Sequence, residues 1–305
     1  MSDIKVFKVK PGGIVELPGK SANIERSLQT LFEKNLEGLL GVRFLASEHD
    51  TGKVHGGRID TLGLDEDGYP VIIEYKRAVT EDVISQGLFY LDWLLDHKKD
   101  FQWLVLEKLG KAAADSVDWS NPRLLCVARD FTKYHQHAVK QIPRNIELIR
   151  YQHFGDDLLL LELVHATSAS NGSGESAISK PHTSNHDTQT FGHRLSQASP
   201  ELKDLFEALN AFLLGLGDDV TTKQLKFYLA FKRIKNFASV EIFPQAKKIC
   251  VYIKVNPDSI KLEEGFTRDV RNVGHYGTGD LEITLRLIED LERAGPLLVR
   301  SYNAS

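Results

Sequence analysis

The spacing of apolar and polar residues predicts a different kind of element in each part of the first forty positions. IKVFKV and GIVEL are short apolar runs around Pro11-Gly12-Gly13, and they predict a small N-terminal hairpin. From Ser21 to Gly41 the apolar residues recur every three to four positions, which predicts an amphipathic helix that ends at the glycine. The chain therefore opens with a hairpin followed by a helix.

The stretch from Gly57 to Lys76, GRIDTLGLDEDGYPVIIEYK, predicts a second hairpin. Asp-Glu-Asp-Gly at 65–68 is typical of a tight turn, and apolar runs flank it on both sides. Pro70 stands where the second strand begins, a position that tolerates the missing N–H. Apolar residues occupy most of both strand faces, so we expect both faces to be buried.

The charged residues of this hairpin fall on one face. If the hairpin folds symmetrically about Asp67, the numbers of paired residues sum to 134, so that Asp60 lies opposite Glu74 and Arg58 opposite Lys76. Opposed side chains are about 5 Å apart at Cβ, where two like charges destabilise a sheet unless a cation or a proton intervenes. The pairing thus indicates a metal site, and the alternative is a structural ion-pair network of the same four residues.

The predicted first helix carries glutamates that could approach this hairpin. At about 100° per residue Glu25 falls inside the apolar arc, Glu33 at its margin and Glu37 outside it. One interpretation is a first-turn carboxylate that complements the helix dipole and extends to water. The other is a carboxylate aimed at the hairpin site.

After the hairpin the pattern alternates between helices and strands. Thr80 to His97 predicts a helix that presents Gln86, Tyr90 and Trp93 on one face. RLLCVA predicts a strand, DFTKYHQHAVKQI a helix, and IELIRYQHF with DLLLLELV a strand pair. No glycine-rich phosphate loop occurs at any strand–helix junction, which argues against a nucleotide-binding fold and favours another α/β core.

A change in composition divides the chain. Residues 1–165 form the α/β domain with its short hairpin, residues 166–200 are rich in Ser, Thr, Asn and Gly and predict a flexible linker, and residues 201–305 predict a smaller α+β domain. The second domain contains a basic aromatic stretch, KQLKFYLAFKRIKNFASVEIFP, which is interpreted either as a nucleic-acid surface or, with more weight, as a half-buried helix and strand with a lysine rim.

Composition limits the partners. The net charge of −4 shows no bulk positive charge for a polyanion, so contact with nucleic acid must be local. Cys126 and Cys250 lie far apart in apolar runs, which favours reduced, buried thiols and a cytoplasmic setting. No apolar run reaches the ~18 residues that span a bilayer, so no membrane is expected.

Taken together, Asp60, thirteen intervening residues, Glu74-Tyr75-Lys76 and Gln86 in the next helix resemble the PD-(D/E)XK nuclease superfamily. The run GRIDTLGLDEDGYPVIIEYKR, followed by QGLFYLDW, is most similar to the RecB-like catalytic domain of NucS-type endonucleases, over residues 21–164. The resemblance implies a restriction-endonuclease-like core, a central mixed sheet flanked by helices. The C-terminal segment, marked by GHYGTGDLEITL, resembles a domain of unknown function found beside such nucleases.

The resemblance also implies roles for individual residues. Asp60, Glu74 and the backbone carbonyl of Tyr75 would bind Mg²⁺ or Mn²⁺, Glu25 would be the helix carboxylate with Glu33 as the fallback, Lys76 would orient or activate the attacking water, and Gln86 would support the site. The expected activity is hydrolysis of phosphodiester bonds in DNA, and the alternative is a non-cleaving nucleic-acid-binding or assembly protein. RNA as the substrate, a homodimer, and a C-terminal domain that binds substrate or a protein partner all stay open. The larger N-terminal DNA-binding domain of NucS-type proteins has no counterpart here, so their substrate preference is not transferred.

Overall fold

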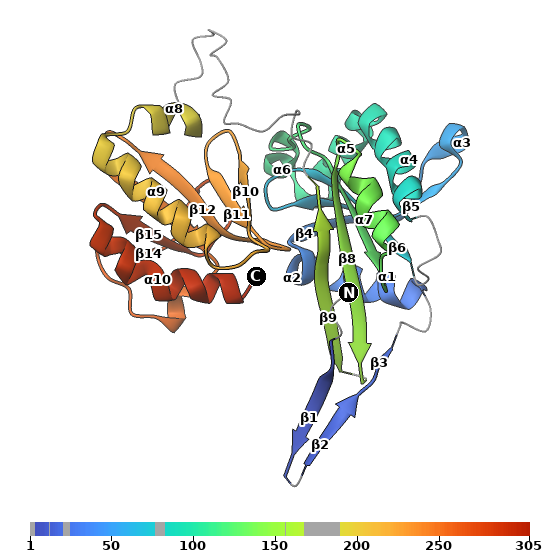
Figure 1. Ribbon diagram of the computed structural model, residues 1–305. Helices are drawn as coiled ribbons and strands as arrows, with labels where there is room; N and C mark the ends of the chain where they lie inside the picture. Colours follow the sequence, from blue (N-terminus) through green and yellow to red (C-terminus); the bar gives the residue numbers. More distant parts are fainter. Residues whose placement is uncertain (1–3, 12, 21–24, 77–82, 156, 168–189) are drawn as a thin grey trace. The chain divides into compact units, whose positions relative to one another are not determined.

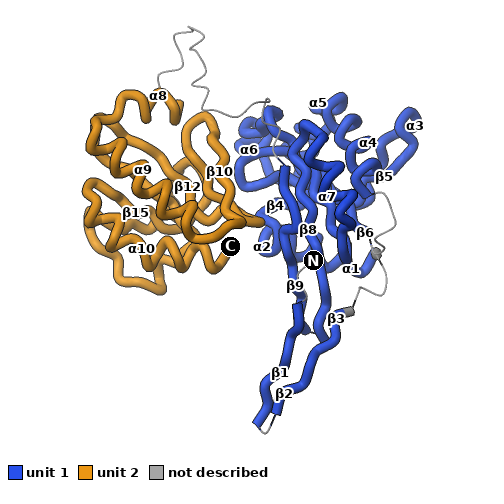
Figure 2. Tube along the Cα trace, viewed as in Figure 1, with its two compact units in different colours: residues 1–173 blue, residues 174–305 orange. Residues whose placement is uncertain are grey.

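A computed structural model describes residues 4–11, 13–20, 25–76, 83–155, 157–167 and 190–305 (Figure 1). The chain divides into two compact units, residues 1–173 and residues 174–305 (Figure 2). Each unit has its own apolar core. None of the helices within the described ranges combines the length and the apolar character that crossing a bilayer requires.

The first unit is built around a seven-stranded mixed sheet, in the order β3-β8-β7-β6-β5-β4 with β9 paired to β8. Its strands are β3 (Gly19–Lys20), β4 (Val42–Asp50), β5 (Arg58–Asp65), β6 (Pro70–Lys76), β7 (Arg123–Ala128), β8 (Asn145–Phe154) and β9 (Leu158–Ala166). β6, β7 and β8 run parallel to one another, and the other pairs are antiparallel. The predicted mixed α/β class is confirmed. The predicted N-terminal hairpin is also present, as a separate sheet of β1 (Val6–Lys10) and β2 (Gly13–Leu17).

Helices cover the sheet of the first unit and bury its strands. The helices of this unit are α1 (Glu25–Lys34), α2 (Leu36–Leu40), α3 (Gly52–His55), α4 (Val83–Asp96), α5 (Lys98–Leu109), α6 (Lys111–Asp115) and α7 (Lys133–Lys140). The short α3 buries none of its own residues and is not part of this cover. Leu62 and Ile72 of the sheet share one core with Leu91 of α4. The ring of Phe32 in α1 meets that of Tyr75 edge-on, with centroids 5.5 Å apart. The central hairpin is therefore buried on both faces, as predicted.

The central hairpin has the predicted register. β5 pairs with β6 from Thr61 opposite Ile73 to Leu64 opposite Pro70, so the paired numbers sum to 134. Asp65 closes the turn, because its Oδ1 accepts from the N–H groups of Asp67 and Tyr69, at 2.9 and 2.8 Å. Gly68 adopts a φ of +85°, which favours glycine. Turn chemistry thus fixes which residues face each other farther along the strands.

Other elements differ from the prediction. The single helix predicted up to Gly41 is two helices, because the side-chain amide of Asn35 donates to the carbonyl of Leu31 at 2.8 Å while its backbone N–H donates to Phe32 O. The side chain takes the place of the helical N–H, which ends α1 there. α3 forms in a predicted loop, and α5 and α6 are helices that the apolar pattern did not predict.

The second unit is an antiparallel sheet in the order β10-β11-β12-β13-β15-β14, with two long helices packed into the same core. Its elements are α8 (Phe191–Ser196), α9 (Pro200–Leu214), β10 (Thr221–Gln224), β11 (Leu229–Lys232), β12 (Asn236–Phe243), β13 (Lys248–Ile253), η1 (Pro257–Ser259), β14 (Thr267–Asp269), β15 (Leu281–Leu285) and α10 (Ile288–Asn303). α8 lies within the residues predicted as a linker, and residues 168–189 of that linker lie outside the described ranges. The basic aromatic stretch forms the strands β10, β11 and β12, so the strand predicted there is present and the helix predicted there is not. Tyr228 and Phe231 are buried in it.

Candidate metal centre

At Asp60 and Glu74 the backbone hydrogen bonds between the two strands of the central hairpin give way to hydrogen bonds from backbone N–H groups to carboxylates. The backbone pairing of β5 with β6 ends at Thr61 opposite Ile73. Beyond it, the Asp60 N–H donates to Glu74 Oε1 at 3.2 Å, and the Tyr75 N–H donates to Asp60 Oδ2 at 2.9 Å. Each carboxylate therefore binds the backbone of the opposite strand. The structure brings together the two residues that the pairing sum placed opposite each other.

Glu74 is the electrostatically unusual member of this pair. It is 0% exposed, and its Oε2 has no hydrogen-bond partner among the described residues. Burial, with the neighbouring charge of Asp60 as a second cause, raises the pKa of Glu74 to about 9. A carboxyl group with that pKa holds a proton at neutral pH. The site therefore accommodates a proton beside Asp60.

Lys76 ends β6 two residues after Glu74, on the same strand face. It is half-buried, and its charge opposes the rise in the pKa of Glu74. Arg58, the other cation of the proposed ion-pair network, is exposed and makes an ion pair with Glu48 at 3.6 Å. Tyr75 packs its ring against Phe32, on the face away from Glu74, so that only its main chain adjoins the carboxylates.

Gln86 and Tyr90 lie on successive turns of α4 and connect that helix to β5. Tyr90 Oη accepts from the Arg58 N–H at 3.2 Å and from Gln86 Nε2 at 3.4 Å. A Cβ at Gly57 would meet Tyr90 Oη at 2.7 Å, so glycine permits this approach. Gln86 is therefore linked through Tyr90 to Arg58, which lies two residues before Asp60 on β5.

The glutamates of α1 are placed differently. Glu25 begins α1, but its side chain lies outside the described part of the chain, so its role stays a prediction. Glu33 Oε1 accepts from Thr61 Oγ1 at 2.7 Å, on the strand face opposite to that of Asp60 and Glu74. The fallback carboxylate thus faces away from the pair. Among the described residues no group of three His, Cys, Asp or Glu side chains is arranged to hold a metal.

Gln29 is a residue of this region that the sequence analysis missed. It is 6% exposed, and its Nε2 lies within hydrogen-bonding distance of the Asp60 carbonyl, at 2.8 Å, and of Ser47 Oγ, at 3.2 Å. It ties α1 to β5 at the residue that bears the first carboxylate. The signal was available, because at about 100° per residue Gln29 falls inside the same apolar arc that drew attention to Glu25.

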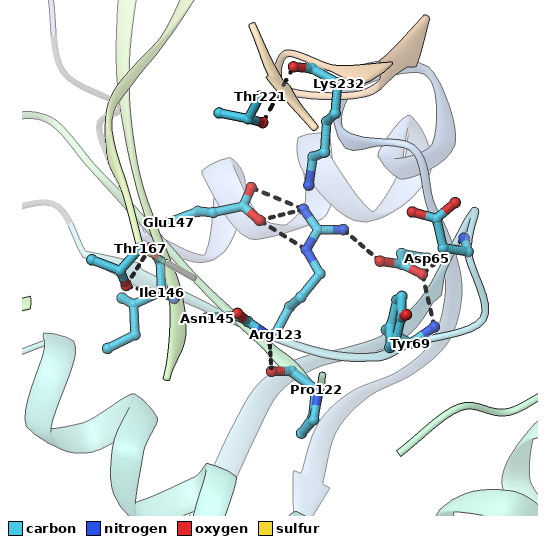
Figure 3. A network of polar contacts seen from close by, with 11 residues as sticks. Asp65, Tyr69, Pro122, Arg123, Asn145, Ile146, Glu147, Thr167, Thr221 and Lys232 are labelled. Carbon is cyan, nitrogen blue, oxygen red and sulfur yellow. Dashed lines mark hydrogen bonds and ion pairs between the residues drawn. The ribbon is translucent and has the colours of Figure 1, made fainter. Parts of the chain in front are cut away.

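A second cluster of buried charges lies near the turn of the same hairpin (Figure 3). Arg123 Nη1 binds Asp65 Oδ2 at 2.9 Å, and Arg123 Nε and Nη2 bind the two oxygens of Glu147, both at 2.8 Å. All three residues are buried. The single guanidinium of Arg123 donates to both carboxylates there, whereas Glu74 Oε2 has no hydrogen-bond partner among the described residues.

Comparison with known proteins gives two matches at the level of sequence. Residues 192–305 match the family described as a domain of unknown function, DUF5655. An uncharacterized protein of Haemophilus influenzae is 29% identical over 303 residues, which cover 95% of this chain and 96% of the relative.

Comparison with solved structures gives partial matches. A repair endonuclease from Pyrococcus abyssi is 22% identical with a TM-score of 0.28, over 45% of this chain and 50% of the other. An EndoMS–dsDNA complex is 24% identical with a TM-score of 0.25, over 41% of this chain and 44% of the other. The chain spans about half the length of the solved structures that it matches.

Proposed function

We propose that the first unit is a restriction-endonuclease-like core and that the protein is a Mg²⁺- or Mn²⁺-dependent endonuclease, which hydrolyses phosphodiester bonds in DNA. The observation that carries this proposal is the fully buried Oε2 of Glu74, which has no hydrogen-bond partner in the part of the chain that the structure describes and lies beside the carboxylate of Asp60. A buried oxygen without a donor is costly unless something binds it. A divalent cation meets that need.

The donors at the site fit such a cation. Asp60 and Glu74 offer carboxylate oxygens, the hard ligands that Mg²⁺ and Mn²⁺ prefer. Binding would displace the proton that the raised pKa of Glu74 otherwise retains. Asp60 and Glu74 would hold the ion, with the carbonyl of Tyr75 and the carboxylate of Glu25 as further ligands.

The other residues would act on the substrate. A bound divalent cation supplies charge neutralisation for the phosphate and lowers the pKa of water. Lys76, on the face of Glu74, would orient the attacking water and offset the negative charge of the phosphodiester. Gln86, held by Tyr90, would support the strand beside the site or contact the scissile strand. Cys126 and Cys250 are buried thiols that are not joined in a disulfide, which supports a cytoplasmic setting.

The test combines metal binding with cleavage. Calorimetric titration with Mn²⁺ should give a binding signal for the wild type that Asp60→Ala removes. Labelled DNA and RNA, single- and double-stranded, should be cleaved with Mn²⁺ by the wild type and not by Lys76→Ala. The matched control is Lys108→Ala, which changes an exposed lysine of α5 and should retain activity.

The outcomes separate the proposal from its alternative. Cleavage that survives in Lys76→Ala would contradict the assigned chemistry. Nucleic-acid binding without cleavage in the wild type would favour the non-cleaving binding or assembly protein. Absence of Mn²⁺ binding that depends on Asp60 would favour a purely structural role for the carboxylate pair.

A further inference from the structure

The β1–β2 hairpin, residues 6–17, is an arm with large exposed apolar side chains. Within the described residues its two strands form a sheet of their own, and Figure 1 shows them extending past the end of the β8–β9 pair. The exposed fractions are 43% for Phe7, 80% for Val9, 65% for Ile14 and 48% for Val15. An isolated two-stranded hairpin is at best marginally stable in water, so this arm gains from a surface to lie on.

The segment from Pro18 to Lys20, which we call the root of the arm, joins the β1–β2 hairpin to the main sheet of the first unit. Pro18 lies between β2 and β3, and its ring fixes φ at a value typical of extended chain. β3 is two residues long and pairs Gly19 with Phe154 and Lys20 with His153. A short, stiff hinge of this kind is typical of elements that are exchanged between identical chains.

An apolar groove opens beside this root, and we name it the α1–β9 groove. It has a volume of about 380 Å³. Its walls are formed by Leu31, Asn35, Gly38, Leu39, His153, Asp157, Leu158 and Leu159. Leu31 is 36% exposed and Leu158 is 46% exposed, so apolar surface lines the opening. His153 belongs both to the wall of the groove and to the strand pair at the root of the arm.

The arm and the groove complement each other in charge as well as in polarity. Lys5, Lys8 and Lys10 lie on or next to β1, against a single acidic residue of the arm, Glu16, which pairs with Lys5 at 3.6 Å. Asp157 is exposed at the groove. An apolar ribbon with lysines therefore suits an apolar groove with a carboxylate at its edge.

We infer that the α1–β9 groove receives the β1–β2 arm of a second copy of this chain, and that the exchange is reciprocal. A two-fold axis near the root of the arm generates both contacts at once, because each groove adjoins the root of its own arm. The two arms then form one continuous interface that covers the exposed apolar residues of both copies. This inference does not depend on the proposed nuclease activity.

The exchange of arms is tested by measuring the molar mass of the full-length protein in solution, by size-exclusion chromatography with light scattering. The wild type should have twice the chain mass of 34.3 kDa. Val9→Lys with Ile14→Lys should halve the mass, and so should Leu158→Lys on the groove side. Val54→Lys is the matched control, because Val54 is 96% exposed and belongs to neither surface, and it should leave the mass unchanged. Unchanged far-UV circular dichroism verifies that each variant folds.

Cross-linking between copies gives a second readout. Val9→Cys and Leu158→Cys are prepared as separate variants, mixed, and oxidised with copper phenanthroline. The mixture should form a disulfide-linked species of two chains in much higher yield than either variant alone, while Cys126 and Cys250 are buried. A monomeric wild type at every concentration, a dimer that survives the arm or the groove substitutions, or cross-linking within one chain when both cysteines are on it would overturn the inference.

Discussion

Glu74→Gln should stabilise the metal-free protein, although it removes a residue of the proposed site. The pKa of Glu74 is raised from its ordinary value of 4.5 to about 9, so the folded state binds this proton more tightly than the unfolded state does. The stability that comes with the proton is fully present below pH 4.5 and is lost as the pH rises towards 9. A neutral amide of the same shape avoids that loss, and its N–H can donate where the carboxylate has only acceptors.

The magnitude follows from the linkage between protonation and folding. One proton held only by the folded state corresponds to about 1.4 kcal/mol per pH unit, so the wild type should lose about 4 kcal/mol of its free energy of unfolding between pH 5 and pH 8. Glu74→Gln should lack this slope. Mn²⁺ at about one hundred times its dissociation constant should restore about 2.7 kcal/mol to the wild type at pH 8 and nothing to the variant.

Urea unfolding followed by tryptophan fluorescence, at pH 5 and pH 8 with EDTA or Mn²⁺, measures these differences. Glu147→Gln serves as the matched control, because it makes the same chemical change at another buried glutamate of the same sheet. Equal pH slopes in the wild type and Glu74→Gln would refute the reasoning, since they would show that Glu74 does not carry the titration.

Three further substitutions test particular contacts. Glu147→Gln should itself lower the free energy of unfolding by about 1.5 to 3 kcal/mol in urea, because Arg123 loses its charge-assisted hydrogen bonds to Glu147 while its ion pair with Asp65 stays. Gly68→Ala should destabilise by more than about 1 kcal/mol in thermal unfolding, since φ is +85° and the added Cβ would meet Ser116 O at 2.6 Å. Gln29→Leu should cost about 1 to 3 kcal/mol in urea and weaken Mn²⁺ binding in calorimetry, because the carbonyl of Asp60 loses its side-chain donor.

The central hairpin could be derived from the sequence because its determinants are local. Asp65 and Gly68 fix the turn, and the two-residue period of a strand then fixes every pair out to Thr61 and Ile73. The meeting of Asp60 and Glu74 followed from that register alone. What the register did not give is how the strands part there, since that depends on each carboxylate accepting from the backbone of the other strand.

The apolar pattern did not predict features that depend on a side chain replacing a backbone hydrogen bond, or on contacts between residues far apart in the chain. The break at Asn35 depends on an amide that replaces a helical N–H, which apolar periodicity does not register. Arg123 joins Asp65 to Glu147 across residues far apart in the chain, and no local pattern around any of the three predicts that they meet. Gln29 was within reach of the helical arc, but only the structure connects it to Asp60.

The two charged clusters of the central hairpin indicate how a site is told from a structural network. Both clusters place carboxylates in buried positions of one sheet, and burial alone does not separate them. At Asp65 and Glu147 a guanidinium supplies a donor to each carboxylate, so the cluster is complete without a ligand. At Glu74 an oxygen stays without a donor and the pKa rises, so the chain tolerates a local conflict in its fold. A buried carboxyl group with a raised pKa is more typical of a functional site than carboxylates held by a guanidinium, and this makes the Asp60–Glu74 pair the better candidate for chemistry.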